Sequence, residues 1–330
     1  MNNINIAIIG ATGLVGRSIA YLLDKRNFPV GQIYFFASAR SAGKTIRFCG
    51  KDYVIEELTA EAFERPIHIA LFSAGGDISK EYAPIAAEKG IVVVDNSSAW
   101  RMNDTVPLIV PEVNPQDAAS HSGIIANPNC STIQAVAAIK PLHDRFNVKR
   151  VVYSTYQAVS GAGQWGIEEL QSSLAGEPPE KFVSPIAFNV IPHIDVFMDN
   201  GYTKEEWKMI EETRKILGTP HMPVTATCCR VPVENGHSVS INLEFEHTID
   251  IEDVFNIIRS APGLVLFDDP AANKYPMPID VSGKDEVFVG RIRRDFSVAN
   301  GINIWVVADN LRKGAATNAV QIAELISKQL

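Results

Sequence analysis

The start of the chain constrains the fold most strongly. An apolar run, Ile4 to Ile9, leads directly into a glycine-rich segment, residues 10–16 (GATGLVG). Such a run is typical of a strand buried on both faces of a parallel sheet. The residues that follow, to about Arg26, have the spacing of an amphipathic helix. A buried strand, a glycine turn and a helix together predict an open α/β sheet with helices on both faces.

The glycine segment also predicts a dinucleotide site. Glycines allow a tight turn, close approach of the backbone to a pyrophosphate, and close packing of helix on strand. The spacing is GxxGxxG and not the commoner GxGxxG, and a glycine pattern alone is also compatible with a simple turn. The strand before it and the helix after it favour the dinucleotide, so we expect a Rossmann-like binding domain.

The end of the second expected strand, residues 33–37 (IYFFA), indicates which dinucleotide binds. A protein that binds NAD usually places Asp or Glu near this point, against the ribose 2′-hydroxyl. Residues 38–44 (SARSAGK) contain no carboxylate, but they offer one arginine, one lysine and two hydroxyl groups that suit a 2′-phosphate. NADP is therefore the predicted cofactor, and a solvated basic loop is the alternative interpretation.

Two further strands are expected at residues 67–72 and 91–94, with a helix between them. Polar or glycine-containing turns follow both strands, at residues 73–76 and 95–98. Because ligands of open α/β sheets bind beyond the carboxyl ends of the strands, both turns are expected at the site. Arg101, just past the second turn, suits an anion, although a lone arginine is more often a solvated surface group.

Cys130 lies in the segment 127–132 (NPNCST). An expected strand at residues 124–126 precedes it, and helical spacing runs over residues 132–146. Pro128 discourages helix at the residue before it, so Cys130 is expected at or just before a helix N-terminus. The unpaired N–H groups and the macrodipole there favour a thiolate and can hold an oxyanion. The alternative is that Cys130 is a small buried hydrophobic residue.

The length of 330 residues suggests about two domains. We expect an NADP-binding domain over residues 1–130, completed by a C-terminal helix at 312–330, and a second domain over residues 131–311. The second domain alternates β-branched and aromatic stretches with helical patterns, which predicts an α+β domain with a mixed sheet and helices on one face. The expected strands are at 151–159, 238–246, 287–292 and 301–308, and the expected helices at 166–174, 204–217 and 251–260.

Composition excludes several classes of protein. The formal net charge of −8 and the absence of a basic run argue against a nucleic-acid surface. No apolar stretch approaches the ~20 residues of a membrane span, and Met1-Asn2-Asn3 leads directly into a strand, so neither a membrane segment nor a signal peptide is expected. Four irregularly spaced cysteines fit a reducing cytoplasm better than a disulfide framework or a zinc site, and no metal is expected.

Nine segments, in order along the chain, carry a resemblance to a known family: GATGLVG, SARSAGK, SAGG, VDNSSAWR, NPNCST, STYQAVSGAG, EEWK, CRVPVENGHS and ADNLRKGAA. Together they resemble aspartate-β-semialdehyde dehydrogenases over the whole length. The resemblance implies reduction of L-aspartyl-4-phosphate to L-aspartate-4-semialdehyde with release of phosphate, on the route to lysine, methionine and threonine. It also implies a homodimer or a tetramer built from dimers, with residues 131–311 as the catalytic and dimerisation domain.

The same resemblance implies roles for individual residues. Cys130 would be the nucleophile that forms an acyl-thioester, Gln157 would orient the substrate, and His237 would be the general acid/base. Arg230 would bind the substrate carboxylate and Glu205 its amino group. The implied phosphate anchors are Arg101, Asn129 and Lys208. The implied cofactor-binding residues are Gly10, Thr12, Gly13, Leu14, Val15, Ser38, Arg40, Ser41, Ser73, Ser160, Gly161 and Asn310.

These residue types suit the chemistry, since a thiolate can displace phosphate from an acyl phosphate and leave a thioester that accepts a hydride. Without the resemblance, the sequence would not single out His237 from seven histidines. Glu205 and Lys208, spaced i, i+3, would be interpreted from the sequence alone as an ordinary surface ion pair. Two other hypotheses remain: another acyl-phosphate reductase, such as N-acetyl-glutamyl-phosphate reductase or glyceraldehyde-3-phosphate dehydrogenase, and a non-catalytic nucleotide-binding relative.

Overall fold

The computed structural model describes residues 3–329, which form two compact units. The first unit contains the chain up to Pro128 and from Ala315 onward, and the second contains Asn129–Gly314. The predicted domain boundary after residue 130 lies two residues beyond this division. A parallel sheet in the first unit and a mixed sheet in the second confirm the α/β fold class predicted from the sequence.

The first unit is built on a six-stranded parallel sheet with the order β5-β2-β1-β6-β7-β8. The inner strands β1, β6 and β7 consist mostly of buried apolar residues, as expected for a sheet covered on both faces. The strands are β1 Ile4–Ile9, β2 Val30–Ala37, β5 Glu56–Glu57, β6 Ile69–Phe72, β7 Val92–Asp95 and β8 Ile124–Ala126. A separate hairpin is formed by β3 Thr45–Phe48 and β4 Lys51–Val54.

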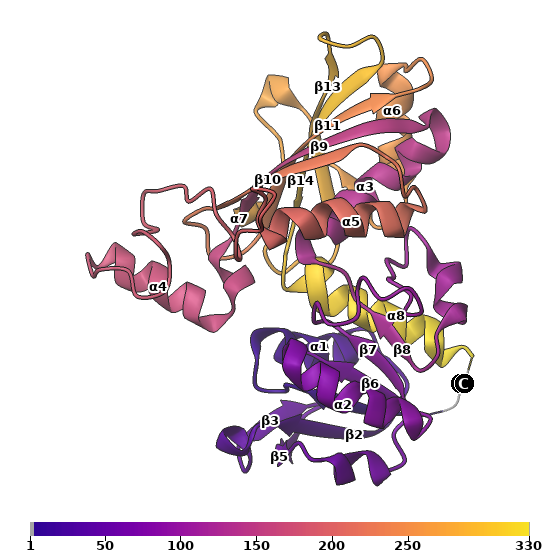
Figure 1. The fold of residues 1–330 in the computed structure, drawn as a ribbon, viewed down its shortest axis with the longest axis vertical. Coiled ribbons are helices and arrows are strands. Elements are labelled where there is room, and N and C mark those ends of the chain that lie inside the picture. The colour runs from indigo at the N-terminus through magenta and orange to yellow at the C-terminus, as the bar shows by residue number, and fades with distance from the viewer. Residues whose placement is uncertain (1–2, 330) are drawn as a thin grey trace. The chain divides into compact units, whose positions relative to one another are not determined.

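Three α-helices cover this sheet: α1 Leu14–Lys25, α2 Gly76–Glu88 and α8 Thr317–Ser327. The last of them comes from the far end of the chain, and in Figure 1 it is drawn in yellow beside the indigo and purple strands. Its apolar residues, among them Val320, Ile322 and Ile326, belong to the same buried core as the strands. Arg26, which ends α1, forms two hydrogen bonds of 2.7 Å with the carboxylate of Glu324 in α8.

The second unit contains a mixed six-stranded sheet with the order β10-β9-β11-β14-β13-β12. The outermost pair on each side is parallel and the inner pairs are antiparallel. The strands are β9 Val148–Gln157, β10 Val224–Arg230, β11 His237–Phe245, β12 Leu264–Leu266, β13 Val287–Asp295 and β14 Gly301–Ala308. The helices are α3 Cys130–Phe146, α4 Gln164–Leu174, α5 Lys204–Leu217, α6 Ile251–Ser260 and α7 Pro278–Val281.

Helices α3, α5 and α6 pack on the sheet of the second unit and share one large apolar core with it (Figure 1). The sequence did not predict β10, although its burial alternates as a half-buried strand should. The buried positions hold Val224, Ala226, Cys228 and Arg230, which are small or charged for the most part. Because β10 lacks large apolar residues, the sequence did not reveal this strand, although it carries the candidate site residue Arg230.

Candidate active site

Cys130 is the first residue of α3. Asn129 is the N-cap: its side-chain oxygen accepts hydrogen bonds from the backbone N–H groups of Ser131 at 2.9 Å and Thr132 at 3.3 Å. The thiol of a half-buried Cys130 therefore lies at the positive end of a 17-residue helix. Gly314 packs against it so closely that a Cβ on Gly314 would lie 2.9 Å from the Cβ of Cys130.

Two buried carboxylates of α5 hold Asn129 in place. The side-chain amide of Asn129 donates to Glu205 at 2.8 Å, and its backbone N–H donates to Glu212 at 2.7 Å. Glu205 is 5% exposed and Glu212 is 1% exposed. Sequence reasoning missed Glu212, although its position seven residues after Glu205 places both on one face of the helix.

Glu205 is the centre of a larger polar network. It also accepts hydrogen bonds from the side chains of Gln157 at 3.2 Å and Lys208 at 3.2 Å, and Lys208 donates to Asp195 at 2.7 Å. Burial opposes ionisation of Glu205, but the charge of Lys208 and the bonds from Asn129 and Gln157 bring its pKa below the ordinary value. The predicted amine-binding carboxylate and the predicted phosphate anchor Lys208 thus form an ion pair.

Arg230 lies beside Gln157, because the two are paired residues of the parallel strands β10 and β9. One guanidinium nitrogen of Arg230 donates to the carbonyl of Ala158 at 2.7 Å. Among the described residues, its other N–H groups have no hydrogen-bond partner, although the side chain is buried. A buried guanidinium with unused donors suits a ligand carboxylate.

His237 is the first residue of β11 and is completely buried. Its Nδ1 accepts a hydrogen bond from the backbone N–H of Ala158 at 3.0 Å, and its carbonyl accepts one from Gln134 at 3.0 Å. Its Nε2 is buried and has no partner in the described part of the chain. Burial, together with the positive charge of Arg230, holds the pKa of His237 well below its ordinary value.

The remaining predicted residues of the second unit lie next to this group. A Cβ on Gly161 would lie 2.9 Å from a guanidinium nitrogen of Arg230 and 3.1 Å from Nε2 of His237. The side-chain amide of Asn310 donates to Ser160 at 3.0 Å, and its oxygen accepts from the backbone N–H of Gly236 at 2.9 Å. The structure thus brings together the predicted residues of this unit: Asn129, Cys130, Gln157, Ser160, Gly161, Glu205, Lys208, Arg230, His237 and Asn310.

In the first unit, a pocket of about 450 Å³ lies at the carboxyl ends of β1, β2 and β6. The predicted cofactor-binding residues that line it are Gly10, Thr12, Gly13, Ser38 and Ser73. Two features require glycine at position 10. Its φ is +84°, and a Cβ would lie 2.7 Å from the carbonyl oxygen of Ser73. Helix α1 has no side-chain cap, which leaves its first N–H groups available to a pyrophosphate.

Other predicted residues of this unit are not among those that line the pocket. Leu14 and Val15 begin α1, and Arg40 and Ser41 form a short 3-10 turn after β2. Arg101 is buried and donates to the carbonyls of Asn96 and Asn127, each at 3.0 Å. The pocket also contains a carboxylate that the sequence did not place there: Glu57, in β5, pairs with Ala37 at the end of β2.

Known proteins resemble the chain over its full length. Residues 5–121 match the family "Semialdehyde dehydrogenase, NAD binding domain", and residues 139–313 match "Semialdehyde dehydrogenase, dimerisation domain". The aspartate-semialdehyde dehydrogenase of Aquifex aeolicus is 55% identical over 333 residues, with 98% of both chains covered. The one from Bacillus subtilis is 49% identical over 339 residues, again with 98% coverage of both. The chain belongs to the aspartate-semialdehyde dehydrogenase family.

Solved structures of aspartate-semialdehyde dehydrogenases agree with this assignment. Aspartate semialdehyde dehydrogenase II from Vibrio cholerae, complexed with ASA, matches with a TM-score of 0.95 and 49% identity over 99% of both chains. The Candida albicans enzyme with NADP matches with a TM-score of 0.77 and 27% identity over 99% of both chains. The chain is therefore an oxidoreductase, and the predicted resemblance is confirmed.

Family membership weighs against both alternative hypotheses. Relatives at about half identity across the full length carry the name aspartate-semialdehyde dehydrogenase, so neither another acyl-phosphate reductase nor a non-catalytic relative is favoured. No group of three or more His, Cys, Asp or Glu side chains that could hold a metal ion occurs within residues 3–329. Over the same residues, no helix is long and apolar enough to cross a lipid bilayer.

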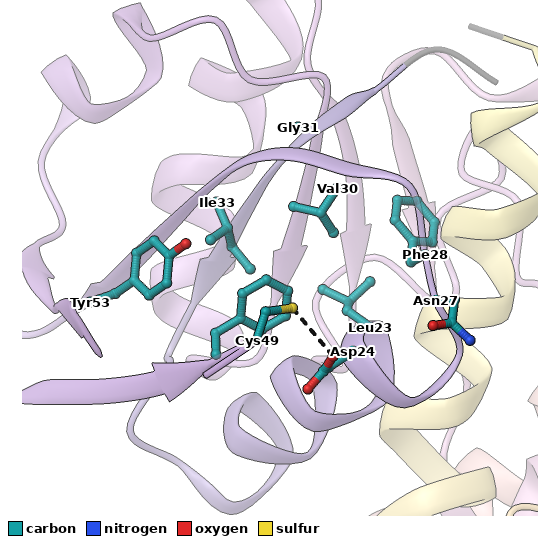
Figure 2. Close-up of a pocket in the computed structure, with 10 residues that line it drawn as sticks. Leu23, Asp24, Asn27, Phe28, Val30, Gly31, Ile33, Cys49 and Tyr53 are labelled. Atoms are coloured by element: carbon teal, nitrogen blue, oxygen red, sulfur yellow. Dashed lines mark hydrogen bonds between the residues drawn. The ribbon is translucent and has the colours of Figure 1, made fainter. Parts of the chain in front are cut away.

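A second hollow in the first unit, of about 350 Å³, lies between the end of α1, the start of β2 and the β3–β4 hairpin (Figure 2). Figure 2 shows the apolar side chains of Leu23, Val30 and Ile33 in the wall, and the thiol of Cys49 pointing to Asp24, to which it donates at 3.3 Å. Burial and the neighbouring carboxylate raise the pKa of Cys49, which makes it a poor nucleophile at neutral pH. This hollow lies at the start of β2, whereas the pocket lined by Gly10 and Ser38 lies at the carboxyl end of that strand.

Proposed function

We propose that the chain catalyses the NADP-dependent reductive dephosphorylation of L-aspartyl-4-phosphate to L-aspartate-4-semialdehyde, a step towards lysine, methionine and threonine. One observation carries the proposal. Cys130 begins α3, and it lies close enough to the buried cation Arg230 for the two side chains to interact electrostatically. A helix N-terminus and a guanidinium are the surroundings that activate a thiolate for attack on an acyl phosphate.

The substrate roles follow from the donors that the second unit offers. Cys130 attacks the acyl carbon, Gln157 orients the substrate, and His237 acts as the general acid/base. Arg230 takes the α-carboxylate with its unused N–H groups, and Glu205, which is ionised, takes the amino group. Asn129 and Lys208 are the proposed phosphate anchors of the second unit, and Arg101 is the proposed anion anchor of the first unit.

The pocket of the first unit suits NADP. Glycine backbone and the uncapped N-terminus of α1 fit a pyrophosphate, and the Arg40 turn fits a 2′-phosphate. The Candida albicans relative that was solved with NADP supports the same choice. When bound, the reduced cofactor supplies the hydride that turns the thioester into the aldehyde. The remaining predicted cofactor contacts are Leu14, Val15, Ser41, Ser160, Gly161 and Asn310.

We further propose a homodimer, or a tetramer of dimers, working in the cytoplasm. The match of residues 139–313 to a dimerisation domain supports the dimer.

The decisive assay is the phosphate-dependent reduction of NADP with L-aspartate-4-semialdehyde, run on the wild type beside Cys130→Ala. Cys130 is half-buried at a helix start, so alanine is compatible with the fold, and circular dichroism with thermal melting verifies this. We expect turnover in the wild type and none above background in the variant. A folded wild type without turnover, or a variant as fast as the wild type, would reject the proposal.

A further inference from the structure

Lys208 lies between two carboxylates that come from different parts of the chain. Its ammonium donates to Glu205, three residues earlier in α5, at 3.2 Å, and to Asp195, in the loop before α5, at 2.7 Å. The side chain of Glu205 is 6% exposed and that of Asp195 is 32% exposed. The ammonium thus bridges a buried carboxylate and a partly exposed one, and its shorter bond is to the exposed partner.

The loop before α5 fixes the position of Asp195. Four residues earlier, the backbone of Ile191 exchanges two hydrogen bonds with that of Arg230, at 3.0 and 2.8 Å. Directly after Asp195, the carbonyl of Val196 accepts from the N–H of Lys204, the first residue of α5, at 2.9 Å. Asp195 itself has a φ of 67°, in the left-handed region that residues other than glycine seldom adopt. Such a conformation persists where the surrounding structure requires it, and it often marks a functional site.

The charges of these three side chains show what Asp195 contributes. Although burial opposes ionisation of Glu205 and Asp195, the Lys208 ammonium and further hydrogen bonds bring the pKa of both carboxyls below the ordinary values. Two carboxylates and one ammonium leave a net charge of −1. Without Asp195, Lys208 and Glu205 would form a neutral pair, which attracts a cation much less than a net negative group does.

We infer that Asp195 is a positioning residue that takes up the charge of Lys208, so that Glu205 keeps a negative charge for the amino group of the substrate. The inference rests on the proposed function, in which Glu205 binds that amino group and Lys208 binds phosphate. Asp195 acts through Lys208 and needs no contact with either substrate. Because it also reduces the positive charge that Lys208 offers to phosphate, it sets the affinity for one substrate against the affinity for the other.

Asp195→Asn tests this role. Asparagine has the same shape, tolerates a positive φ and keeps the side-chain oxygen that accepts from the N–H of Val196. We expect the KM for L-aspartate-4-semialdehyde to rise about fivefold, because Lys208 then neutralises Glu205. The KM for phosphate should fall, because the group has lost a negative charge. The value of kcat should stay near that of the wild type, since the amino group binds alike in the ground state and the transition state.

Three controls separate charge from structure. Asp199→Asn removes the same charge from an exposed position of the same loop and should leave both KM values unchanged. Asp195→Gly suits the positive φ as well and should reproduce the changes seen in Asp195→Asn. The aldehyde 4-oxobutanoate has the carboxylate of the substrate but no amino group, so its inhibition constant should not rise in either variant. Circular dichroism with thermal melting verifies that the variants are folded.

The outcomes distinguish this inference from the proposed function. If both KM values rise together, or if the inhibition constant of 4-oxobutanoate rises as well, Asp195 has only a structural role and the inference is overturned. An unchanged KM for the semialdehyde overturns it too. In each of these cases the wild type turns over and the proposed function stands. A folded wild type without turnover refutes the proposed function, and the inference with it.

Discussion

Replacing Gly161 by alanine inserts one methyl group between Arg230 and His237. The backbone of Gly161 is not in the left-handed region, so alanine adopts it without strain. The new Cβ would lie 2.9 Å from a guanidinium nitrogen of Arg230 and 3.1 Å from Cε1 and Nε2 of His237. Ordinary van der Waals contact begins at 3.4 Å, so one or both side chains must move.

The size of this movement sets the expected loss of activity. Arg230 must retreat by about 0.5 Å, against a 2.7 Å hydrogen bond that ties it to the carbonyl of Ala158. A misplacement of about 1 Å near reacting groups costs roughly 10²-fold in rate. We therefore expect Gly161→Ala to lower kcat/KM for L-aspartate-4-semialdehyde about tenfold, equivalent to about 1.4 kcal/mol of transition-state stabilisation.

Gly163, in the same turn, provides the control. A Cβ there would meet nothing within 4 Å, but its φ of 88° and ψ of −167° are available almost only to glycine. Gly163→Ala should therefore destabilise the fold by about 1–3 kcal/mol while leaving kcat/KM near the wild type. If Gly161→Ala keeps the wild-type kcat/KM, or if both variants lose activity equally, the steric reasoning is wrong.

Asn129→Ala removes the N-cap of α3 and should lower the free energy of unfolding by about 1–2 kcal/mol in chemical denaturation; an unchanged value would contradict the capping role. Glu205 has a lowered pKa, so its stabilising effect is complete above about pH 4.5 and is lost as the pH falls through the folded-state pKa. The stability difference between wild type and Glu205→Gln should therefore shrink on acidification, and a growing difference would reject this sign. Arg40→Ala should raise the KM for NADP several-fold more than the KM for NAD, whereas Glu57→Gln, which removes a negative charge from the pocket, should lower the KM for NADP. Equal changes for both cofactors would exclude contact with the 2′-phosphate.

The regular elements of the first unit were largely predictable, because they follow from periodicity and short connections. Strands 4–9 and 124–126 have the predicted bounds, and the helix after the glycine turn ends within one residue of the prediction. The β3–β4 hairpin was missed, because its strands are four residues long and carry mostly polar side chains. Strand β5 is shorter still, so nothing in the sequence placed Glu57 in the pocket.

Candidate site residues were found less by pattern than by resemblance, and the structure explains why. Arg230 and Gln157 are 73 positions apart and become neighbours only through the β9–β10 register, which no local signal encodes. Glu212 was missed, because a buried acid in an amphipathic helix cannot be told from a solvated one until its partner, the backbone N–H of Asn129, is known. The unpaired Nε2 of His237 can likewise be recognised only in the three-dimensional structure.

The elements β14 and α8 follow the strands that they pack against in the sequence, and this order has a consequence for synthesis on the ribosome. Strand β14 lies between β11 and β13, in the middle of its sheet, and α8 contributes a set of buried residues to the other unit. The residues of β14 and α8 thus contribute to both hydrophobic cores. Before these residues emerge from the ribosome, the nascent chain exposes an open sheet edge in the second unit and unfilled apolar surface in both units. This protein should therefore depend on chaperone protection until β14 and α8 have been synthesised.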